Sequence, residues 1–363
     1  MTSTTSRILN FSAGPATLPE PVLHQAQQDL WNIQESGIGI CEHSHRGPVF
    51  DAVIEEAVSN CRILGNIPED FEILFMQGGA TLQFAMIAMN FLGEGETANY
   101  IDTGVWTSKA IKEAKKLGNV HVAYDGSTTN YDHCPTNDEL NLKDNAAYLH
   151  FCSNNTIYGT RSTEVPRTDS PVICDMSSDF FSRAIDWNAY DMVYGGAQKN
   201  LGPSGTVLII IRKFMLEKCS DKLPLMLNYN AIAQKGSMLN TPPTFGIYLM
   251  GEVFKWILSV GGLQAMEARN EHKAGMIYDA LDSCSDFYST FAQKPSRSRM
   301  NISFKSKTPE LDALFLEEST AQGMSGLKGH RNLGGLRASV YNAFPEEGCE
   351  RFAEFLHSFA SSH

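Results

Sequence analysis

The residue with the clearest chemical potential is Lys199, which lies in the segment YGGAQKNLGPSG (194–205). Its neighbours are small and uncharged, and glycines allow a backbone to approach a ligand closely. A lysine in such surroundings can lose its proton and become a nucleophile. The alternative is an ordinary solvated surface cation, which is what most lysines are.

Asp175 gives this lysine a partner. It ends the apolar run PVICD and precedes Lys199 by 24 residues. Open α/β sheets place ligand groups at the carboxyl ends of their strands. Pyridoxal phosphate (PLP) needs both residue types, because the lysine forms a Schiff base and the carboxylate keeps the pyridine nitrogen protonated. Taken alone, Asp175 would be interpreted as a turn or helix-cap aspartate.

Two further segments could hold such a cofactor. QGGAT (77–81) lies between an apolar run and a helical pattern, and backbone N–H groups at a helix start bind phosphate. It has the form of neither a Walker loop nor a G-x-G-x-x-G turn, and an ordinary tight turn would look the same. Trp106, in GVWTSKA, could stack on a flat ring or be a core or interface tryptophan.

The elements that position these residues follow a regular order. Continuous short apolar runs separated by helical patterns predict an α/β fold, with a mainly parallel sheet covered by helices on both faces. The predicted strands are residues 71–76, 99–104, 121–125, 146–152, 171–178, 192–196 and 206–212.

The pattern changes after about residue 245 and predicts a smaller α+β unit. We expect a large domain over residues 17–258, and a small domain over 259–363 that also includes the N-terminal segment 1–16. The predicted elements of this unit are helices at 245–260, 267–282, 311–323 and 346–362 and strands at 299–306 and 334–342.

The composition and net charge limit the kinds of molecule that this protein is expected to bind. The formal charge of −12, from 41 acidic and 29 basic residues, argues against nucleic acid or an anionic membrane. It does not exclude an anionic small substrate, since a few arginines can reverse the field in one cleft. We find neither a signal-peptide core nor an apolar run long enough to span a membrane, so we expect a cytoplasmic protein. The eight cysteines include no C-x-x-C pair and are expected to be reduced and mostly buried.

Together these segments resemble fold-type I PLP enzymes and, among them, the class V aminotransferases. The resemblance extends over nearly the whole chain and implies a seven-stranded sheet in the large domain. It rests on motifs in the family's order: NFSAGPATLP, SHRG, MQGGAT, DTGVW, SNNTIYGT, DMSSDFFSR, YGGAQKNLGPSG, LNTPPTF and GHRNLGGLRASVYNA.

The resemblance implies a role for each residue that matches a cofactor motif. Lys199 would carry PLP, Asp175 would bind the pyridine nitrogen, and Trp106 would stack on the ring. One matching segment would reach the cofactor phosphate of the partner subunit, which implies a homodimer. The remaining cofactor residues are Thr156 near the ring hydroxyl, Ala80, Thr81 and Gln198 at the phosphate, and Asn240 and Thr241 from the partner.

Substrate residues follow in the same way. Arg337 matches the arginine that grips the substrate α-carboxylate, a task suited to a guanidinium fork. Two His-Arg pairs match anchors for a phosphate or side-chain carboxylate, and the neighbouring subunit can supply the second of them. These pairs are His45 with Arg46 and His330 with Arg331. His43 and His45 could instead form a metal pair, but no third ligand is apparent, so we expect no metal.

The implied reaction transfers an amino group between L-glutamate and 3-phosphohydroxypyruvate, giving O-phospho-L-serine and 2-oxoglutarate in L-serine biosynthesis. Some members of the family also act on the phosphorylated oxo acid that leads to 4-phosphohydroxy-L-threonine, in vitamin B6 synthesis.

Other interpretations share Lys199 and Asp175. A serine–pyruvate or alanine–glyoxylate aminotransferase should lack the two His-Arg pairs. A cysteine desulfurase usually has a histidine where Trp106 lies and a catalytic cysteine in a loop. A non-catalytic PLP-binding protein should have lost the substrate arginines.

Overall fold

The structure, a computed structural model, describes residues 7–363. Residues 1–6, which belong to the predicted N-terminal segment 1–16, lie outside the described residues. Within the described part of the chain, no helix is both long and apolar enough to cross a membrane.

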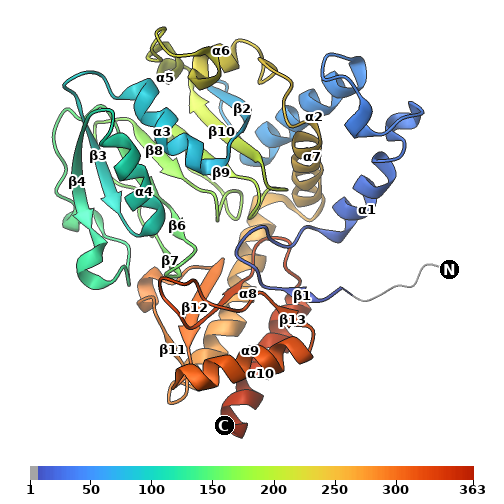
Figure 1. Ribbon diagram of the computed structural model, residues 1–363, viewed down its shortest axis with the longest axis vertical. Helices are drawn as coiled ribbons and strands as arrows, with labels where there is room; N and C mark the ends of the chain where they lie inside the picture. The colour runs from blue at the N-terminus through green and yellow to red at the C-terminus, as the bar shows by residue number, and fades with distance from the viewer. Residues whose placement is uncertain (1–6) are drawn as a thin grey trace.

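A seven-stranded sheet forms the centre of the larger part of the molecule (Figure 1). Strand β10 runs antiparallel to both of its neighbours, and β9, β8, β5, β3 and β4 run parallel to one another. The mainly parallel α/β fold predicted from the sequence is therefore confirmed. In sheet order the strands are β2 (Phe71–Gln77), β10 (Thr206–Arg212), β9 (Met192–Gly196), β8 (Val172–Asp175), β5 (Leu149–Cys152), β3 (Thr97–Asp102) and β4 (Asn119–Asp125).

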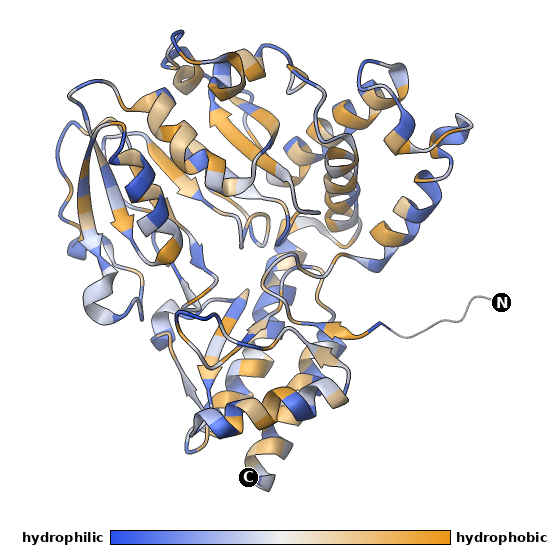
Figure 2. Ribbon diagram, in the orientation of Figure 1, coloured by the Kyte–Doolittle hydropathy of each residue, from blue (hydrophilic) through white to orange (hydrophobic). Residues whose placement is uncertain are grey.

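Helices cover both faces of this sheet, and each face has its own apolar core. Figure 2 shows the central strands as apolar bands between amphipathic helices. This is why the strand sequences are continuous apolar runs and do not alternate with polar residues. One face packs on α3 (Gly79–Phe91) and α4 (Val105–Ala114), and the other on α2 (Pro48–Gly65) and α7 (Thr244–Ser259), with α1 (Glu20–Asp29) outside α7.

Two connections differ from the expected alternation of strands and helices. Between β5 and β9 the described chain contains no α-helix. It forms the hairpin of β6 (Asn154–Asn155) and β7 (Thr160–Arg161), and then turns leading to the 3-10 helix η5 (Trp187–Ala189). Polar side chains, described below, hold these turns in place of a packed helix.

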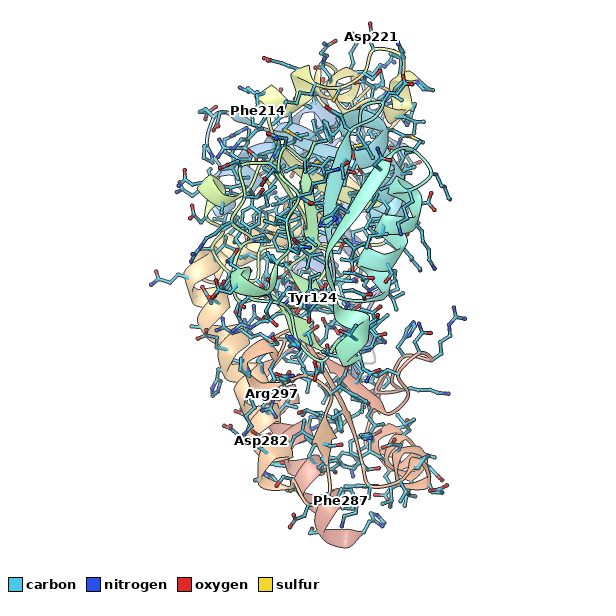
Figure 3. All side chains as sticks on the ribbon, turned by 90° about the vertical axis from the view of Figure 1, so that its left-hand side faces the viewer. Tyr124, Phe214, Asp221, Asp282, Phe287 and Arg297 are labelled. Carbon is cyan, nitrogen blue, oxygen red and sulfur yellow. The ribbon has the colours of Figure 1, made fainter. Side chains whose placement is uncertain are left out.

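The C-terminal part packs around a third apolar core (Figure 3), which is rich in phenylalanine and includes Phe287. Strand β1 (Leu9–Asn10) pairs there with β13 (Met324–Ser325), so the N-terminal segment joins this part. The separate core and this pairing favour a division near residue 258, which stays a prediction. Its other elements are α8 (Gly262–Ser283), β11 (Ser289–Thr290), β12 (Asn301–Lys305), α9 (Pro309–Ala321), β14 (Leu336–Ser339) and α10 (Glu346–Ser362).

Short helices complete the connections. They are the α-helices α5 (Lys213–Glu217) and α6 (Tyr229–Ala233) and the 3-10 helices η1 (Ile33–Glu35), η2 (Ile40–Glu42), η3 (Gly126–Thr129), η4 (Asn137–Glu139), η6 (Leu225–Leu227) and η7 (Lys294–Ser296). All eight cysteines are free thiols and five are buried, as predicted; those five are Cys61, Cys134, Cys152, Cys174 and Cys349.

Candidate active site

Asp175 is the last residue of β8 and is buried at the carboxyl edge of the sheet. Ser177 donates to its Oδ1 from the backbone N at 2.9 Å and from Oγ at 2.6 Å. Burial raises the pKa of Asp175, while the charge of Lys199 and the bonds from Ser177 oppose that rise. The lysine and the aspartate predicted from the sequence therefore lie close enough to interact.

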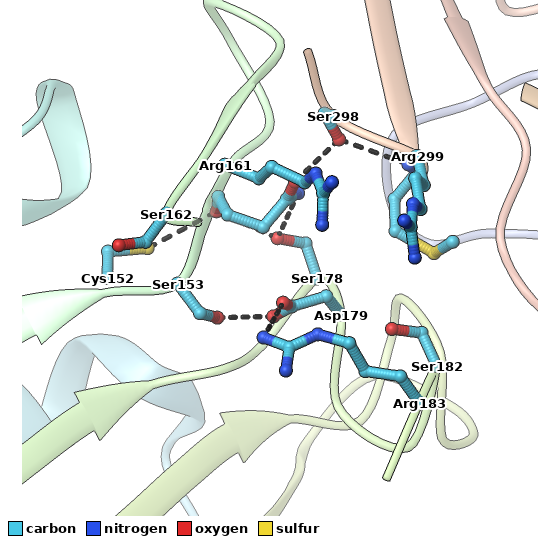
Figure 4. A network of polar contacts seen from close by, with 12 residues as sticks. Cys152, Ser153, Arg161, Ser162, Ser178, Asp179, Ser182, Arg183, Ser298 and Arg299 are labelled. Carbon is cyan, nitrogen blue, oxygen red and sulfur yellow. Dashed lines mark hydrogen bonds and ion pairs between the residues drawn. The ribbon is translucent and has the colours of Figure 1, made fainter. Parts of the chain in front are cut away.

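A second buried carboxylate supports the turn behind Asp175 (Figure 4). Asp179 accepts a short hydrogen bond from Ser153 Oγ and lies 3.7 Å from Arg183 Nη2. The backbone N of Ser153 donates in turn to the carbonyl of Asp175 at 3.1 Å. This network fixes the end of β8 without a helix behind it, because the side chains of Ser153, Asp179 and Arg183 each have a polar partner.

Lys199 lies in the tight connection between β9 and β10. Desolvation lowers the pKa of Lys199; Arg337 contributes to the lowering, and Asp175 opposes it. The N-terminal segment crosses directly over this connection, since Ala16 N donates to the Gln198 carbonyl at 2.9 Å. At Gly14, with φ +142°, a Cβ would lie 3.3 Å from Lys199 Cγ, so the close approach requires glycine.

Trp106, in the first turn of α4, faces the same amine. Lys199 Nζ lies 5.3 Å from the centroid of its ring. The indole Nε1 donates to Thr156 Oγ1 at 3.0 Å, and Arg337 Nη1 donates to the Thr156 carbonyl at 2.8 Å. Arg337 Nε is buried and has no hydrogen-bond partner among the described residues. Trp106, Thr156, Lys199 and Arg337 therefore form one constellation.

The predicted phosphate residues lie at the start of α3 and beside Lys199. Gly78 and Gly79 have φ of +92° and +64°, and they turn the chain from β2 into the helix that begins Gly79-Ala80-Thr81. Gln198 is close to Gly196, where a Cβ would lie 2.6 Å from Gln198 Oε1. The helix start presents the unpaired N–H groups that an anion requires.

The charge of the Arg337 guanidinium acts on His330 of the same chain. Desolvation lowers the pKa of His330, and the charges of Arg337, Arg331 and Lys109 lower it further. Lys109 Nζ also lies 4.6 Å from the Trp106 ring centroid, so it is a cation of the site that sequence reasoning missed. Its position three residues after Trp106, on the same face of α4, was the available signal.

Two predicted groups remain apart from this constellation within one chain. Arg46 Nε donates to His45 Nε2 at 3.3 Å on a surface turn before α2, and the half-buried Asn240 bonds only to the carbonyl of the exposed Thr241. No hydrogen bond or ion pair among residues 7–363 connects either group to Lys199. His43, to which no role was assigned, bonds to Ser36 Oγ at 2.8 Å.

The residues present fit PLP. The Asp175 carboxylate has only Oδ1 engaged, and over the described chain Oδ2 has no protein donor, so it can accept from a protonated ring nitrogen. Lys199 provides an amine, Trp106 a flat face, and the start of α3 an anion site. These groups would hold, respectively, the aldehyde, the ring and the phosphate.

A large open groove lies elsewhere. Residues 142–147 and 165–172, which precede β5 and β8, line it, so it opens at the opposite edge of the sheet from Asp175. It contains none of the predicted site residues. The candidate site therefore rests on the polar constellation, and not on the size of a hollow. In residues 7–363, no three His, Cys, Asp or Glu side chains are grouped so that they could hold a metal ion.

Comparison with known proteins agrees with the fold and the site. The family described as Aminotransferase class-V matches residues 8–352. The chain therefore belongs to the class V aminotransferases, and it is a PLP-dependent enzyme. Within that class it belongs to the phosphoserine aminotransferase family, as the relatives below show.

The similarity covers almost the whole chain. This chain is 48% identical to the phosphoserine aminotransferase of Desulfotalea psychrophila, over 98% of its own length and 99% of the relative. The structure of phosphoserine aminotransferase from Bacillus circulans subsp. alkalophilus superposes with a TM-score of 0.96, at 48% identity over 98% of this chain and 99% of that one. The PLP-bound enzyme from Trichomonas vaginalis gives 0.92, at 38% identity over 96% and 99%.

Proposed function

We propose that this chain transfers the amino group of L-glutamate to 3-phosphohydroxypyruvate, giving O-phospho-L-serine and 2-oxoglutarate. The observation that carries the proposal is that Asp175 and the constellation of Trp106, Thr156, Lys199 and Arg337 meet at one edge of the sheet. Family membership and relatives named phosphoserine aminotransferase support the same reaction.

Bound PLP supplies a carbonyl carbon that exchanges amines and a ring that withdraws electrons from the substrate Cα. Asp175 would hold a proton at the ring nitrogen, and Trp106 would orient the ring. Lys199, whose pKa is lowered by desolvation, would act as the base that removes the Cα proton and later returns one. Arg337 would bind the α-carboxylate through donors that include the unpartnered Nε.

The phosphate of the substrate would meet the cations Arg331 and Lys109, with the His330 imidazole beside them as a hydrogen-bond donor. His45 and Arg46 would add a second anchor. Both substrates carry at least two negative charges, so local cations matter more than the net charge of −12. The same anchors would accept the phosphorylated oxo acid of vitamin B6 synthesis.

We also propose a homodimer whose sites lie at the subunit interface. The exposed loops that hold Arg46 and Thr241 have no target within one chain. Large apolar side chains are exposed in the segment before His45: Leu30 at 47%, Trp31 at 84% and Ile38 at 40%. Exposed apolar clusters mark protein interfaces, and a partner subunit would cover them. A cytoplasmic location is part of the same proposal, and so are a large domain over 17–258 and a small domain over 259–363 that includes the N-terminal segment 1–16.

The direct test is glutamate-dependent amination of 3-phosphohydroxypyruvate by the purified protein. The holoenzyme should be yellow, and Lys199→Ala should lose both the visible band of the lysine-bound cofactor and turnover. Near-normal transamination by Lys199→Ala would contradict the assignment. Activity with serine and pyruvate, and none with the phosphorylated oxo acid, would favour the serine–pyruvate type.

Arg46→Ala tests the phosphate anchor. It should raise KM for 3-phosphohydroxypyruvate selectively, because its partner in the proposal is the phosphate group. The control substrate is an oxo acid of similar length without phosphate. Equal losses for both substrates would remove Arg46 from the anchor.

A further inference from the structure

Lys273 is a fully buried lysine on α8, and no described carboxylate lies within ion-pair distance of it. Its ammonium donates instead to carbonyl oxygens of the loop between β14 and α10. Burial lowers the pKa of Lys273 to about 7, but the carbonyl oxygens around it can only accept hydrogen bonds and so favour the protonated amine. The titratable groups that also act on it are Cys349, Arg269 and Glu346, and the last two pair with each other at 2.8 Å. The cation is therefore balanced by backbone dipoles and not by a counter-ion. The distances from Nζ are 3.2 Å to Val340 O, 2.5 Å to Tyr341 O, 3.4 Å to Asn342 O and 3.2 Å to Phe344 O.

Carbonyl oxygens that converge on one point repel one another unless a cation lies between them. Rings of such oxygens replace the hydration shell of K⁺ in proteins. The Lys273 ammonium has three N–H donors for four oxygens, so it acts here as a monovalent cation on a tether. Without it, the loop would hold four buried acceptors around an empty centre, at a large desolvation cost.

The loop closed by Lys273 contacts the segment that contains Lys199. The backbone N of Asn342 donates to Asn200 Oδ1 at 3.0 Å. Asn200 Nδ2 donates to the Ser178 carbonyl at 3.1 Å, on the turn that follows Asp175. Asn270, one turn before Lys273 on α8, donates to Asn342 Oδ1 at 2.8 Å. Asn200 is covalently adjacent to Lys199. A displacement of the loop would therefore displace Asn200 and, with it, the amine of Lys199.

We propose that Lys273 is a built-in monovalent cation that closes the carbonyl cage of residues 340–344 and thereby positions Lys199 through Asn342 and Asn200. Lys273 is a positioning residue, since it touches neither substrate nor cofactor. The cage itself is a site of monovalent-cation chemistry, which the lysine occupies. The link to Lys199 rests on the proposed function, whereas the cage does not.

The cage is tested on cofactor-free protein, by melting in chlorides of different cations at equal ionic strength. Lys273→Ala should melt several degrees below wild type in tetramethylammonium, which is too large for the cage, and recover much of that loss in potassium or ammonium. Wild type should not distinguish the cations. The matched control is Lys255→Ala. It removes a lysine of α7 that pairs with two carboxylates, Glu56 and Glu252, and its melting temperature should be the same in all three salts. Equal melting of Lys273→Ala in all three salts would overturn the cage.

The link is tested on the holoenzyme, by the pH midpoint of the visible band and by kcat. Asn200→Ala keeps the cage and cuts the contact, so it should shift the midpoint and lower kcat about ten- to a hundredfold. Lys273→Ala in tetramethylammonium should shift the midpoint in the same direction, and potassium should reverse that shift in Lys273→Ala but not in Asn200→Ala. A wild-type midpoint and kcat in Asn200→Ala would overturn the link.

Two failures are decided separately. If Lys273→Ala folds in none of the salts, Asn200→Ala alone decides the link, and the cage proposal is rejected because the free cation did not replace the lysine. If the wild-type protein does not aminate 3-phosphohydroxypyruvate, the melting results still decide the cage.

Discussion

The Asp175 carboxylate and the Arg337 guanidinium act on the amine of Lys199 in opposite directions. Desolvation lowers the pKa of Lys199, Arg337 lowers it further, and Asp175 raises it. A base that must exchange protons near neutral pH benefits from the lowering. The two charged neighbours also have binding tasks of their own, so the site tunes its base with groups that it needs for other reasons.

The two neighbours give opposite predictions in cofactor-free protein. Asp175→Asn removes the negative charge that favours the ammonium, so the pKa of Lys199 should fall. Arg337→Met removes a positive charge, so the pKa should rise. The measurement is the pH dependence of Lys199 acylation, followed by mass spectrometry of its peptide, with the surface residue Lys116 as internal reference. Shifts of the same sign in both variants would contradict the assigned charges.

Individual site residues could be predicted from the sequence where the residue type has few alternative roles in its surroundings. Lys199, Asp175 and Trp106 were predicted, and the structure places the lysine near both of the others. Lys109 was not, because a lysine on an amphipathic helix is normally solvated. Lys273 was not either, since its four acceptors are backbone carbonyls, which leave no mark in the sequence.

The elements of the site meet at turns that leave little room for side chains. Gly104 caps α4 with φ +145°, and a Cβ there would clash with Asn155 Nδ2. Asn155 in turn donates to the Thr103 carbonyl at 3.0 Å. The first turn of α4, which carries Trp106, is thus held by a contact that only glycine permits.

Gly104→Ala should therefore destabilise the fold and displace Trp106. We expect a loss of about 1–3 kcal/mol in the free energy of unfolding, from the strained backbone conformation together with the clash with Asn155. Denaturant unfolding measures the loss, and Trp106 quenching on cofactor addition reports the displacement. Gly95→Ala, also at positive φ but with open space around its Cβ position, is the control that has strain without the clash. Equal effects of the two substitutions would show that the contact with Asn155 is unimportant.

A polar cluster connects the loop after β4 to the C-terminal part of the molecule. His133 Nδ1 lies 2.7 Å from Asp132, and Gln293 Nε2 donates to Asp132 Oδ2 at 2.9 Å. Desolvation lowers the pKa of His133, but bonds and charges from Asp132 and Glu139 outweigh it and leave the pKa raised. The charged histidine therefore stabilises the native state.

This cluster predicts a pH-dependent stability. Because the folded pKa exceeds the unfolded one, the contribution is fully present below about pH 6 and is lost as pH rises through the folded pKa. His133→Gln should lower the free energy of unfolding at low pH by up to about 1 kcal/mol and have less effect at higher pH. Denaturant melts of both proteins across this range test it, and a difference that grows with pH would contradict the sign.

The order and type of the main elements could be predicted because apolar periodicity is local. The strands β2, β9 and β10 and helix α10 lie within one residue of their predicted bounds. The direction of β10 could not be predicted, since a buried apolar run has the same composition in either orientation. The helix-free path from β5 to β9 was missed because polar contacts between distant residues, such as Ser153 with Asp179, hold it.

At the scale of the whole molecule, the loops that hold Arg46 and Thr241 make no hydrogen bond or ion pair, among residues 7–363, to Lys199 of their own chain. A dimer with shared sites predicts complementation between two inactive variants. Lys199→Ala lacks the amine, and Thr241→Glu places a negative charge where the partner's cofactor phosphate is proposed to bind. Subunits exchanged between the two should form hybrids with one intact site.

Mixing equal amounts under exchange conditions should therefore restore about a quarter of wild-type activity, since half of the dimers are hybrids with one of two sites intact. Each variant alone, carried through the same exchange, is the control. No recovery, with hybrids present by mass spectrometry, would show that Thr241 serves the site of its own subunit.

The crossing of the N-terminal segment over Lys199 has a consequence for the order in which the protein is made. Gly14 and Ala16 contact the lysine connection, yet β1 is held by β13, close to the other end of the chain. During synthesis the first residues leave the ribosome long before the strand that receives them exists. The large sheet can form on the ribosome. The N-terminal segment can be held against the Lys199 connection only when the polypeptide is nearly finished. A nascent chain that stops before β13 should therefore have the sheet and no secure place for its cofactor.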